Sequence, residues 1–169
     1  MGCQPTDIGE VHMIQETLTG SVLEIPEHHK FRKAWRWSPE IERKLSAEME
    51  TFHSLHICCG NSNLGKVRLD VDPDSQANVI GNMRNLPFKN CTFERVLSDP
   101  PWKLNIFQRF KPFYEAIRVC TVGGTIIYNA PWVPDSKSVV LKEVYYRCDA
   151  PFRQVSLVLF FEKITKEFD

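Results

Sequence analysis

The segment Asp99-Pro100-Pro101-Trp102 gathers a carboxylate, two prolines and the largest aromatic side chain at one corner of the chain. It closes an apolar run, residues 93–99, and proline interrupts strands and helices alike. A carboxylate and a proline-locked carbonyl can accept the protons of an amino group, while Trp102 offers a face on which a nucleobase stacks. The alternative is a rigid turn with a capping aspartate and a core tryptophan.

Three other groups of residues follow predicted strands and can contact a nucleoside. Gly60 and Gly65 lie in the segment HICCGNSNLG, where they let a backbone approach a ligand or simply form a tight turn. Asp70 or Asp72 can accept the hydroxyl groups of a ribose, or end a strand before a turn. Strand alternation puts both aspartates on the same side, so the sequence leaves the choice open. Asn82 can hydrogen-bond an adenine or be an ordinary loop residue.

Two further segments combine aromatic residues with polar or basic ones. The segment NAPW, residues 129–132, echoes the first corner after another predicted strand, and it predicts either a wall of the substrate pocket or a turn. The segment EHHKFRKAWRW interleaves aromatic residues with cations that include Lys30, Arg32 and Lys33. Such a segment can bind single-stranded or flipped-out nucleic acid, or it can pack its tryptophans on the domain and leave its charges in water.

Alternating strands and helices must position these residues. A helix is predicted over residues 38–52, with Ser38 as N-cap, Pro39 at the first helical position and an apolar stripe at helical spacing. A second helix is predicted to begin at Pro112. Residues 73–82 predict a short helix or turn, and residues 136–147 predict a helix that runs into a strand. The predicted strands are residues 54–59, 66–72, 93–99, 125–131 and 154–164.

This order predicts an α/β fold with a mostly parallel sheet, helices on both faces and a C-terminal antiparallel hairpin. In such a sheet, ligands bind beyond the carboxyl ends of the strands, near the point where the strand order switches. The candidate residues all follow predicted strands, so we expect them to meet at that edge.

The motifs together resemble the class I methyltransferases that use S-adenosylmethionine. The DPPW segment is similar to the (D/N/S)-P-P-(Y/F/W) motif of the enzymes that methylate amino groups, including the adenine DNA and RNA methyltransferases. The segments LHICCGNSNLG, VRLDVDP, VIGNMRNLPFKNCTFERVL and EAIRVCTVGGTIIY resemble other motifs of the class, in the same order. The resemblance covers residues 54–163 and implies a Rossmann-like, seven-stranded fold.

The resemblance also implies the cofactor and the site. S-adenosylmethionine is the expected cofactor and S-adenosylhomocysteine its product. The expected catalytic residues are Asp99, Pro100, Pro101 and Trp102. The expected cofactor contacts are Cys58, Cys59, Gly60, Asn61, Asp70, Asp72, Asn82, Met83 and Asp99. The expected substrate contacts are Trp102, Asn129, Trp132, Lys30, Arg32 and Lys33. The chain departs from the pattern where His56 replaces an acid, Cys58 a glycine and Asn82 an aspartate.

Composition bounds the remaining possibilities. The chain has 169 residues and equal numbers of basic and acidic residues, 21 of each, which argues against binding to nucleic acid by bulk electrostatics alone. Six scattered cysteines without a C-x-x-C pair argue against a zinc site or a disulfide framework, and favour reduced thiols in a cytoplasmic protein. No apolar run is long enough to span a membrane and no secretory signal is visible.

We therefore expect an N-terminal extension over residues 1–37 and a methyltransferase domain over residues 38–169. The expected function is methylation of the exocyclic amino group of adenine in DNA or RNA. The alternatives are the same cofactor with another acceptor (a cytosine amino group, a protein glutamine amide or a small molecule), or an inactive domain that binds nucleic acid or a partner. The chain has no room for a separate target-recognition domain, so a homodimer or a specificity partner is a further expectation.

Overall fold

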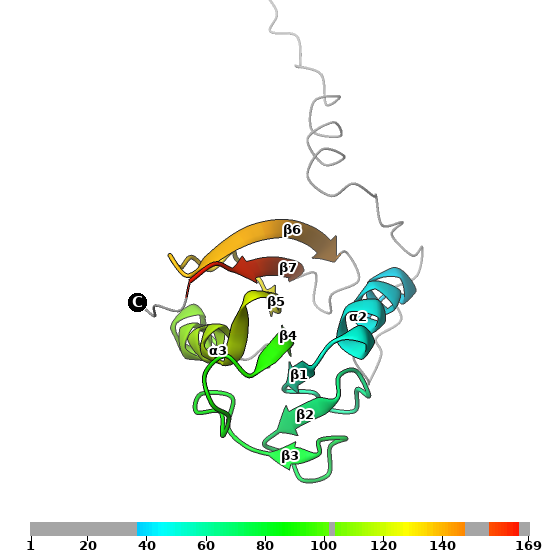
Figure 1. The fold of residues 1–169 in the computed structure, drawn as a ribbon. Coiled ribbons are helices and arrows are strands. Elements are labelled where there is room, and N and C mark those ends of the chain that lie inside the picture. The colour runs from blue at the N-terminus through cyan, green and yellow to red at the C-terminus, as the bar shows by residue number, and fades with distance from the viewer. Residues whose placement is uncertain (1–36, 102–103, 148–155, 166–169) are drawn as a thin grey trace, which may run out of the picture.

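One seven-stranded sheet forms the centre of the molecule, and a helix packs on each of its faces (Figure 1). The computed structural model describes residues 37–101, 104–147 and 156–165. In order, the elements are α2 (Pro39–Thr51), β1 (Ser54–Ile57), β2 (Val67–Asp70), β3 (Val79–Ile80), β4 (Phe93–Ser98), α3 (Ile106–Val119), β5 (Cys120–Ala130), β6 (Val139–Arg147) and β7 (Ser156–Lys163).

The strand order β3-β2-β1-β4-β5-β7-β6 confirms the predicted seven-stranded, mostly parallel sheet. Strands β1 to β5 pair in parallel, whereas β7 runs antiparallel to both β5 and β6. Strands β6 and β7 therefore form the predicted C-terminal hairpin at one end of the sheet, with β3 at the other end (Figure 1). The strand order switches between β1 and β4, which is where a ligand is expected in this type of sheet.

Alternation along the strands divides the core between the two faces. In β4, Val96 packs in one cluster of buried residues and the next residue, Leu97, packs in the other. The cluster that contains Val96 includes Phe113 of α3, and the cluster that contains Leu97 includes Leu45 of α2. Because neighbouring strand residues point to opposite faces, α2 and α3 cover opposite sides of the sheet.

Helix α2 forms as its sequence predicts. The Ser38 hydroxyl accepts a hydrogen bond from the Ile41 N–H at 3.4 Å, and Pro39 occupies the first turn, where its missing N–H costs nothing. Ile41, Leu45 and Met49 are buried against the sheet, at the spacing of one helix face. Trp37, which the sequence assigned to the N-terminal extension, is also buried in this cluster.

Helix α3 begins six residues earlier than its sequence suggested, and Pro112 lies inside it. Asn105 and Gln108 form a reciprocal capping box, each side chain accepting a backbone N–H of the other residue at 3.0 Å. Pro112 removes one helical hydrogen bond, but the helix buries Pro112 and Phe113 against the sheet. Capping and burial therefore outweigh the local preference that proline has for a first turn.

One other local prediction also changes, and one open alternative is resolved. Residues 136–138 do not form the predicted helix: the chain enters β6 at Val139, where β-branched and tyrosine side chains favour pairing with β7. For residues 73–82, the turn that the sequence offered as an alternative to a helix is confirmed, and it is followed by the two-residue strand β3. In the part of the chain that the structure describes, α2 and α3 are the only helices, and neither is long and apolar enough to cross a membrane.

Candidate active site

Four polar residues line up across the carboxyl ends of four neighbouring strands. Strand β1 pairs Ile57 with Leu69 of β2 and with Ser98 of β4, and β4 pairs Ser98 with Tyr128 of β5. One residue further on, the same register brings Asp70, Cys58, Asp99 and Asn129 into one row. The Asp99 N–H donates to the Ile57 carbonyl at 3.1 Å, which anchors the corner to the end of β1.

Asp70 lies at the β2 end of this row and faces the loop that follows β1. Its carboxylate accepts hydrogen bonds from the Gly60 N–H at 2.8 Å and from the Asp72 N–H at 3.0 Å. Asp72 is exposed, lies beyond the end of β2, and accepts the Asp74 N–H at 3.0 Å. The two aspartates are therefore not equivalent: Asp70 belongs to the row of strand ends and Asp72 to the turn after it.

The loop after β1 combines a strained residue with an open glycine. Cys58 has a φ of 59°, in the left-handed region that favours glycine, and Gly60 has a φ of 51°. A Cβ added at Gly60 would meet no atom within 4 Å, so space is open beside that backbone. Asn61 is exposed in the turn, and the Cys59 side chain is buried.

The Cys58 side chain lies between the two carboxylates. Its thiol donates to the Met83 sulfur at 3.3 Å, and both residues pack on the core cluster below α3. Burial raises the pKa of the Cys58 thiol strongly, and the charges of Asp70 and Asp99 raise it further. The side chain is therefore a neutral thiol at neutral pH, and it is not a competing nucleophile in this row.

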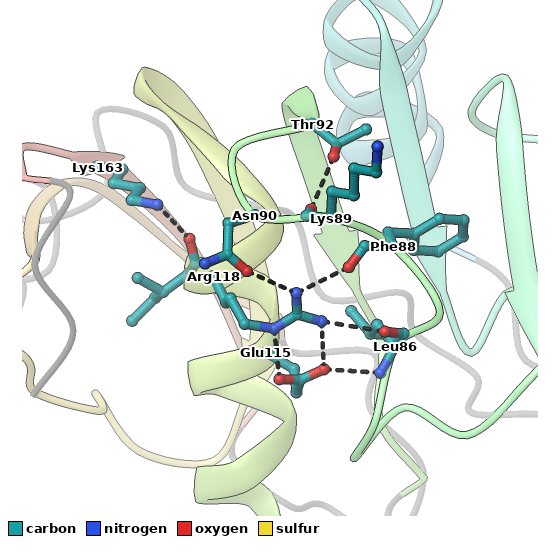
Figure 2. A network of polar contacts seen from close by, with 9 residues as sticks. Leu86, Phe88, Lys89, Asn90, Thr92, Glu115, Arg118 and Lys163 are labelled. Atoms are coloured by element: carbon teal, nitrogen blue, oxygen red, sulfur yellow. Dashed lines mark hydrogen bonds and ion pairs between the residues drawn. The ribbon is translucent and has the colours of Figure 1, made fainter.

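The loop that carries Asn82 and Met83 is fixed to α3 by an arginine–glutamate pair (Figure 2). Arg118 donates through Nε and Nη2 to the two carboxylate oxygens of Glu115, both at 2.8 Å. The Glu115 carboxylate also accepts the Leu86 N–H at 2.7 Å. Arg118 further donates to the carbonyls of Leu86 and Phe88 at 3.1 and 2.8 Å. The pair thus binds the backbone of this loop and sets its place beside β4.

The ionisation of this pair follows from its contacts. Burial alone would raise the pKa of Glu115, but the hydrogen bonds from Arg118 and Leu86 outweigh burial and lower it. The same pair raises the pKa of Arg118. Both groups therefore remain charged, and the bidentate geometry is the strong form of this contact. Asn82 itself is exposed, and its side-chain oxygen accepts the Arg84 N–H at 2.9 Å.

Asp99 and Asn129 meet at the other end of the row. The Asn129 Nδ2 donates to Asp99 Oδ1 at 2.7 Å, and the Ser156 hydroxyl donates to Asn129 Oδ1 at 2.9 Å. Asp99 is half-buried, Pro100 is buried and Pro101 is exposed. Asn129 has only 1% of its surface exposed, so its side chain lies behind Asp99 in the protein interior.

Arg109 is the residue near this corner that the sequence reasoning missed. It is 1% exposed, and its guanidinium donates to the carbonyls of Pro101, Leu104 and Asn129 at 2.9, 3.2 and 3.4 Å. Burial lowers the pKa of Arg109, and the charge of Asp99 is among those that oppose this. The sequence did contain one signal for this role: Arg109 is a cation four residues before Phe113, so it lies on the buried face of the helix.

The remaining candidate residues divide between this region and segments outside the described structure. Trp132 is half-buried, contacts the Phe110 ring edge-on with 6.2 Å between ring centroids, and lies 5.9 Å from the Arg109 guanidinium carbon. Trp102, Lys30, Arg32 and Lys33 lie outside the described residues. Within the described residues, no group of three or more histidine, cysteine, aspartate or glutamate side chains could hold a metal ion.

Comparison with known proteins identifies the fold. No protein-family model and no curated protein sequence matches the chain. Among solved structures, an S-adenosylmethionine-dependent methyltransferase of Methanosarcina mazei superposes with a TM-score of 0.54 at 10% identity, over 77% of this chain and 99% of that chain. The N-methyltransferase NodS of Bradyrhizobium japonicum gives 0.53 at 12% identity, over 75% of this chain and 97% of that chain. A TehB-like S-adenosylmethionine-dependent methyltransferase of Corynebacterium glutamicum gives 0.50 at 16% identity, over 65% and 79%. The chain therefore has the Rossmann-like fold of class I methyltransferases.

Proposed function

We propose that this chain transfers a methyl group from S-adenosylmethionine to the exocyclic amino group of adenine in DNA or RNA. The observation that supports this most strongly is the row of strand ends, with Asp70 at one side, Asp99 at the other and the left-handed Cys58 between them. It lies at the switch point of a sheet whose fold is that of class I methyltransferases.

The residues at the β1 and β2 ends fit the proposed cofactor. Space is open beside Gly60, and the Asp70 carboxylate faces the same loop. Each carboxylate oxygen has two lone pairs, so Asp70 can accept ribose hydroxyls while it keeps the Gly60 N–H. Asn82 and Met83, on the loop that Arg118 fixes, would contact the adenine ring. When bound, S-adenosylmethionine supplies a methyl group on a sulfonium, which the acceptor nitrogen takes with loss of one proton.

The residues at the β4 end fit an amino group as acceptor. The lone pair of an exocyclic amine is delocalised into its ring, so the protein must accept hydrogen bonds from the amino protons and turn the lone pair toward the methyl group. The Asp99 carboxylate and the Pro100 carbonyl would accept these protons, and Asp99 would take the proton that nitrogen loses. Two consecutive prolines restrict the backbone, so this carbonyl is oriented at little entropic cost. Trp102 would stack on the base.

Transfer of a radioactive methyl group to oligonucleotides tests this function. We expect label in adenine-containing single strands of DNA or RNA and none in matched strands without adenine. Asp99→Ala should lower the rate at least a hundredfold, whereas Glu50→Ala, an exposed carboxylate on α2, should not change it. Equal transfer to adenine-free strands would contradict the acceptor, and unchanged activity in Asp99→Ala would contradict the role of Asp99. Mass spectrometry of the product distinguishes cytosine or protein acceptors, and calorimetry without detectable cofactor binding would favour a non-catalytic domain.

A further inference from the structure

A buried side chain stands directly behind the proposed acceptor carboxylate. Asn129 is the second-last residue of β5 and its side chain lies inside the protein, where its amide nitrogen donates to Asp99 Oδ1 at 2.7 Å. A donor at that distance makes a short hydrogen bond of the kind that carboxylates form with N–H groups. The contact therefore defines the direction in which the Asp99 carboxylate faces.

The Asn129 amide is held in place by a second buried residue. The Ser156 hydroxyl, at the start of β7, donates to Asn129 Oδ1 at 2.9 Å and is fully buried. An amide that was turned over would place its oxygen against the Asp99 carboxylate and its NH₂ group against the hydroxyl. The Asp99 carboxylate, which only accepts, therefore selects the observed orientation, and the Ser156 hydroxyl holds it by donating to Oδ1.

The backbone of the same asparagine is held by a buried cation. Arg109 donates to the Asn129 carbonyl at 3.4 Å and to the Pro101 carbonyl at 2.9 Å, so it ties the end of β5 to the corner that contains Asp99. Its positive charge interacts with Asp99 across the site. The Asn129 amide and the Arg109 cation therefore both favour a negatively charged Asp99 over a neutral one.

We propose that Asn129, held in place by Ser156, is a positioning residue that fixes the Asp99 carboxylate as an ionised proton acceptor. The inference rests on the proposed methyl transfer and deepens it, since Asn129 acts through Asp99 and does not contact the substrate. It assigns Asn129 a different role from the substrate contact that the sequence suggested. A carboxylate held in this way accepts the amino proton without first having to reorient.

Variants at both positions test the proposal kinetically. Asn129→Leu removes the NH₂ donor to Asp99, so we expect kcat to fall about a hundredfold with little change in cofactor affinity. Ser156→Ala should lower kcat about fivefold, as expected for one net hydrogen bond. Ser156→Thr keeps the hydroxyl and should recover most of that loss. Ser54→Ala, a buried serine at the amino end of β1, serves as control and should change stability but not kcat.

A second measurement does not require activity. The carbon-13 shift of the Asp99 carboxylate, identified by its absence in Asp99→Asn, can be followed during a pH titration. We expect its midpoint to lie about one pH unit higher in Asn129→Leu than in the unaltered protein, and Ser156→Ala to move it in the same direction. If the unaltered protein methylates nothing, the proposed function fails, while these midpoints still test the contact.

The two measurements have clear contrary outcomes. Asn129→Leu with kcat within twofold of the unaltered protein would overturn the proposal. So would equal rates in Ser156→Ala and Ser156→Thr, or identical titration midpoints in all variants. If the Asn129 variants do not fold, the milder Ser156 pair alone decides, because alanine and threonine differ there in whether they keep the hydroxyl.

Discussion

The buried side chain of His56 predicts how the free energy of unfolding changes with pH. It lies in β1, and only 1% of its surface is exposed. Its Nδ1 lies 3.3 Å from the Leu64 carbonyl, whereas its Nε2 has no hydrogen-bond partner among the described residues. Burial lowers the pKa of this imidazole from 6.5 to about 4, so it folds as the neutral form.

The size of the effect on stability follows from these two pKa values. The unfolded chain binds the His56 proton below a pH of about 6.5, whereas the folded chain does so only near 4. The free energy of unfolding therefore falls as the pH falls through this interval, and the loss from this group is complete only below the folded pKa. Between about pH 7.5 and about pH 5, His56 should remove about 2 kcal/mol, at about 1.4 kcal/mol for each pH unit below 6.5.

Urea unfolding of His56→Asn at these two pH values measures this contribution. The asparagine amide can still donate to Leu64 but does not titrate, so the variant should lose about 2 kcal/mol less stability on acidification than the unaltered protein. His53→Asn is the matched control, because His53 is exposed and also contacts a backbone carbonyl, that of Thr92. Equal losses in His56→Asn and in the unaltered protein would show that this imidazole is not the source.

Three further predictions concern the cofactor side of the site. Asp70→Asn should weaken S-adenosylhomocysteine binding about tenfold or more in calorimetry, since a charge-assisted hydrogen bond is lost. Asp72→Asn should change this binding by less than about threefold, and a larger effect of Asp72→Asn than of Asp70→Asn would refute Asp70 as the ribose ligand. Arg118→Lys should lower the free energy of unfolding by about 2 kcal/mol, because a lysine cannot reproduce the bidentate pair and both carbonyl contacts. Unchanged urea unfolding would show that Arg118 does not hold this loop. In the folded protein at about pH 8, iodoacetamide should label Cys58 much more slowly than after unfolding, because burial and the nearby carboxylates raise the pKa of this half-buried thiol; equally rapid labelling in the folded protein would contradict the raised pKa.

The sheet was predictable from the sequence because its strands are apolar runs separated by turn residues. Local patterns were less informative where tertiary contacts decide the structure. Pro112 indicated a helix start, yet the capping box at Asn105 lies a full two turns earlier and buried contacts carry the helix past the proline. Residues 139–147 have apolar spacing that suits a helix or a strand, and pairing with β7 decides for the strand.

The site was predictable in its strand-end positions and not in its supporting contacts. Asp70, Cys58 and Asp99 each lie at the end of a predicted strand, and the parallel pairing of β1 with β2 and with β4 places these ends side by side. The contacts of Arg109 and Ser156 depend on side chains that meet from distant parts of the chain. No spacing in the sequence encodes such a meeting, and it required the packing of α3 and β7 on the sheet.

Mass spectrometry of nucleosides tests the central claim most directly. The protein is incubated with S-adenosylmethionine that carries a deuterated methyl group and with adenine-containing DNA and RNA, which are then digested. We predict labelled N-methyladenine in at least one of the two nucleic acids, and at least a hundredfold less with Asp99→Ala. Label absent from every nucleoside, while calorimetry shows that the cofactor binds, would contradict methylation of a nucleobase at this site.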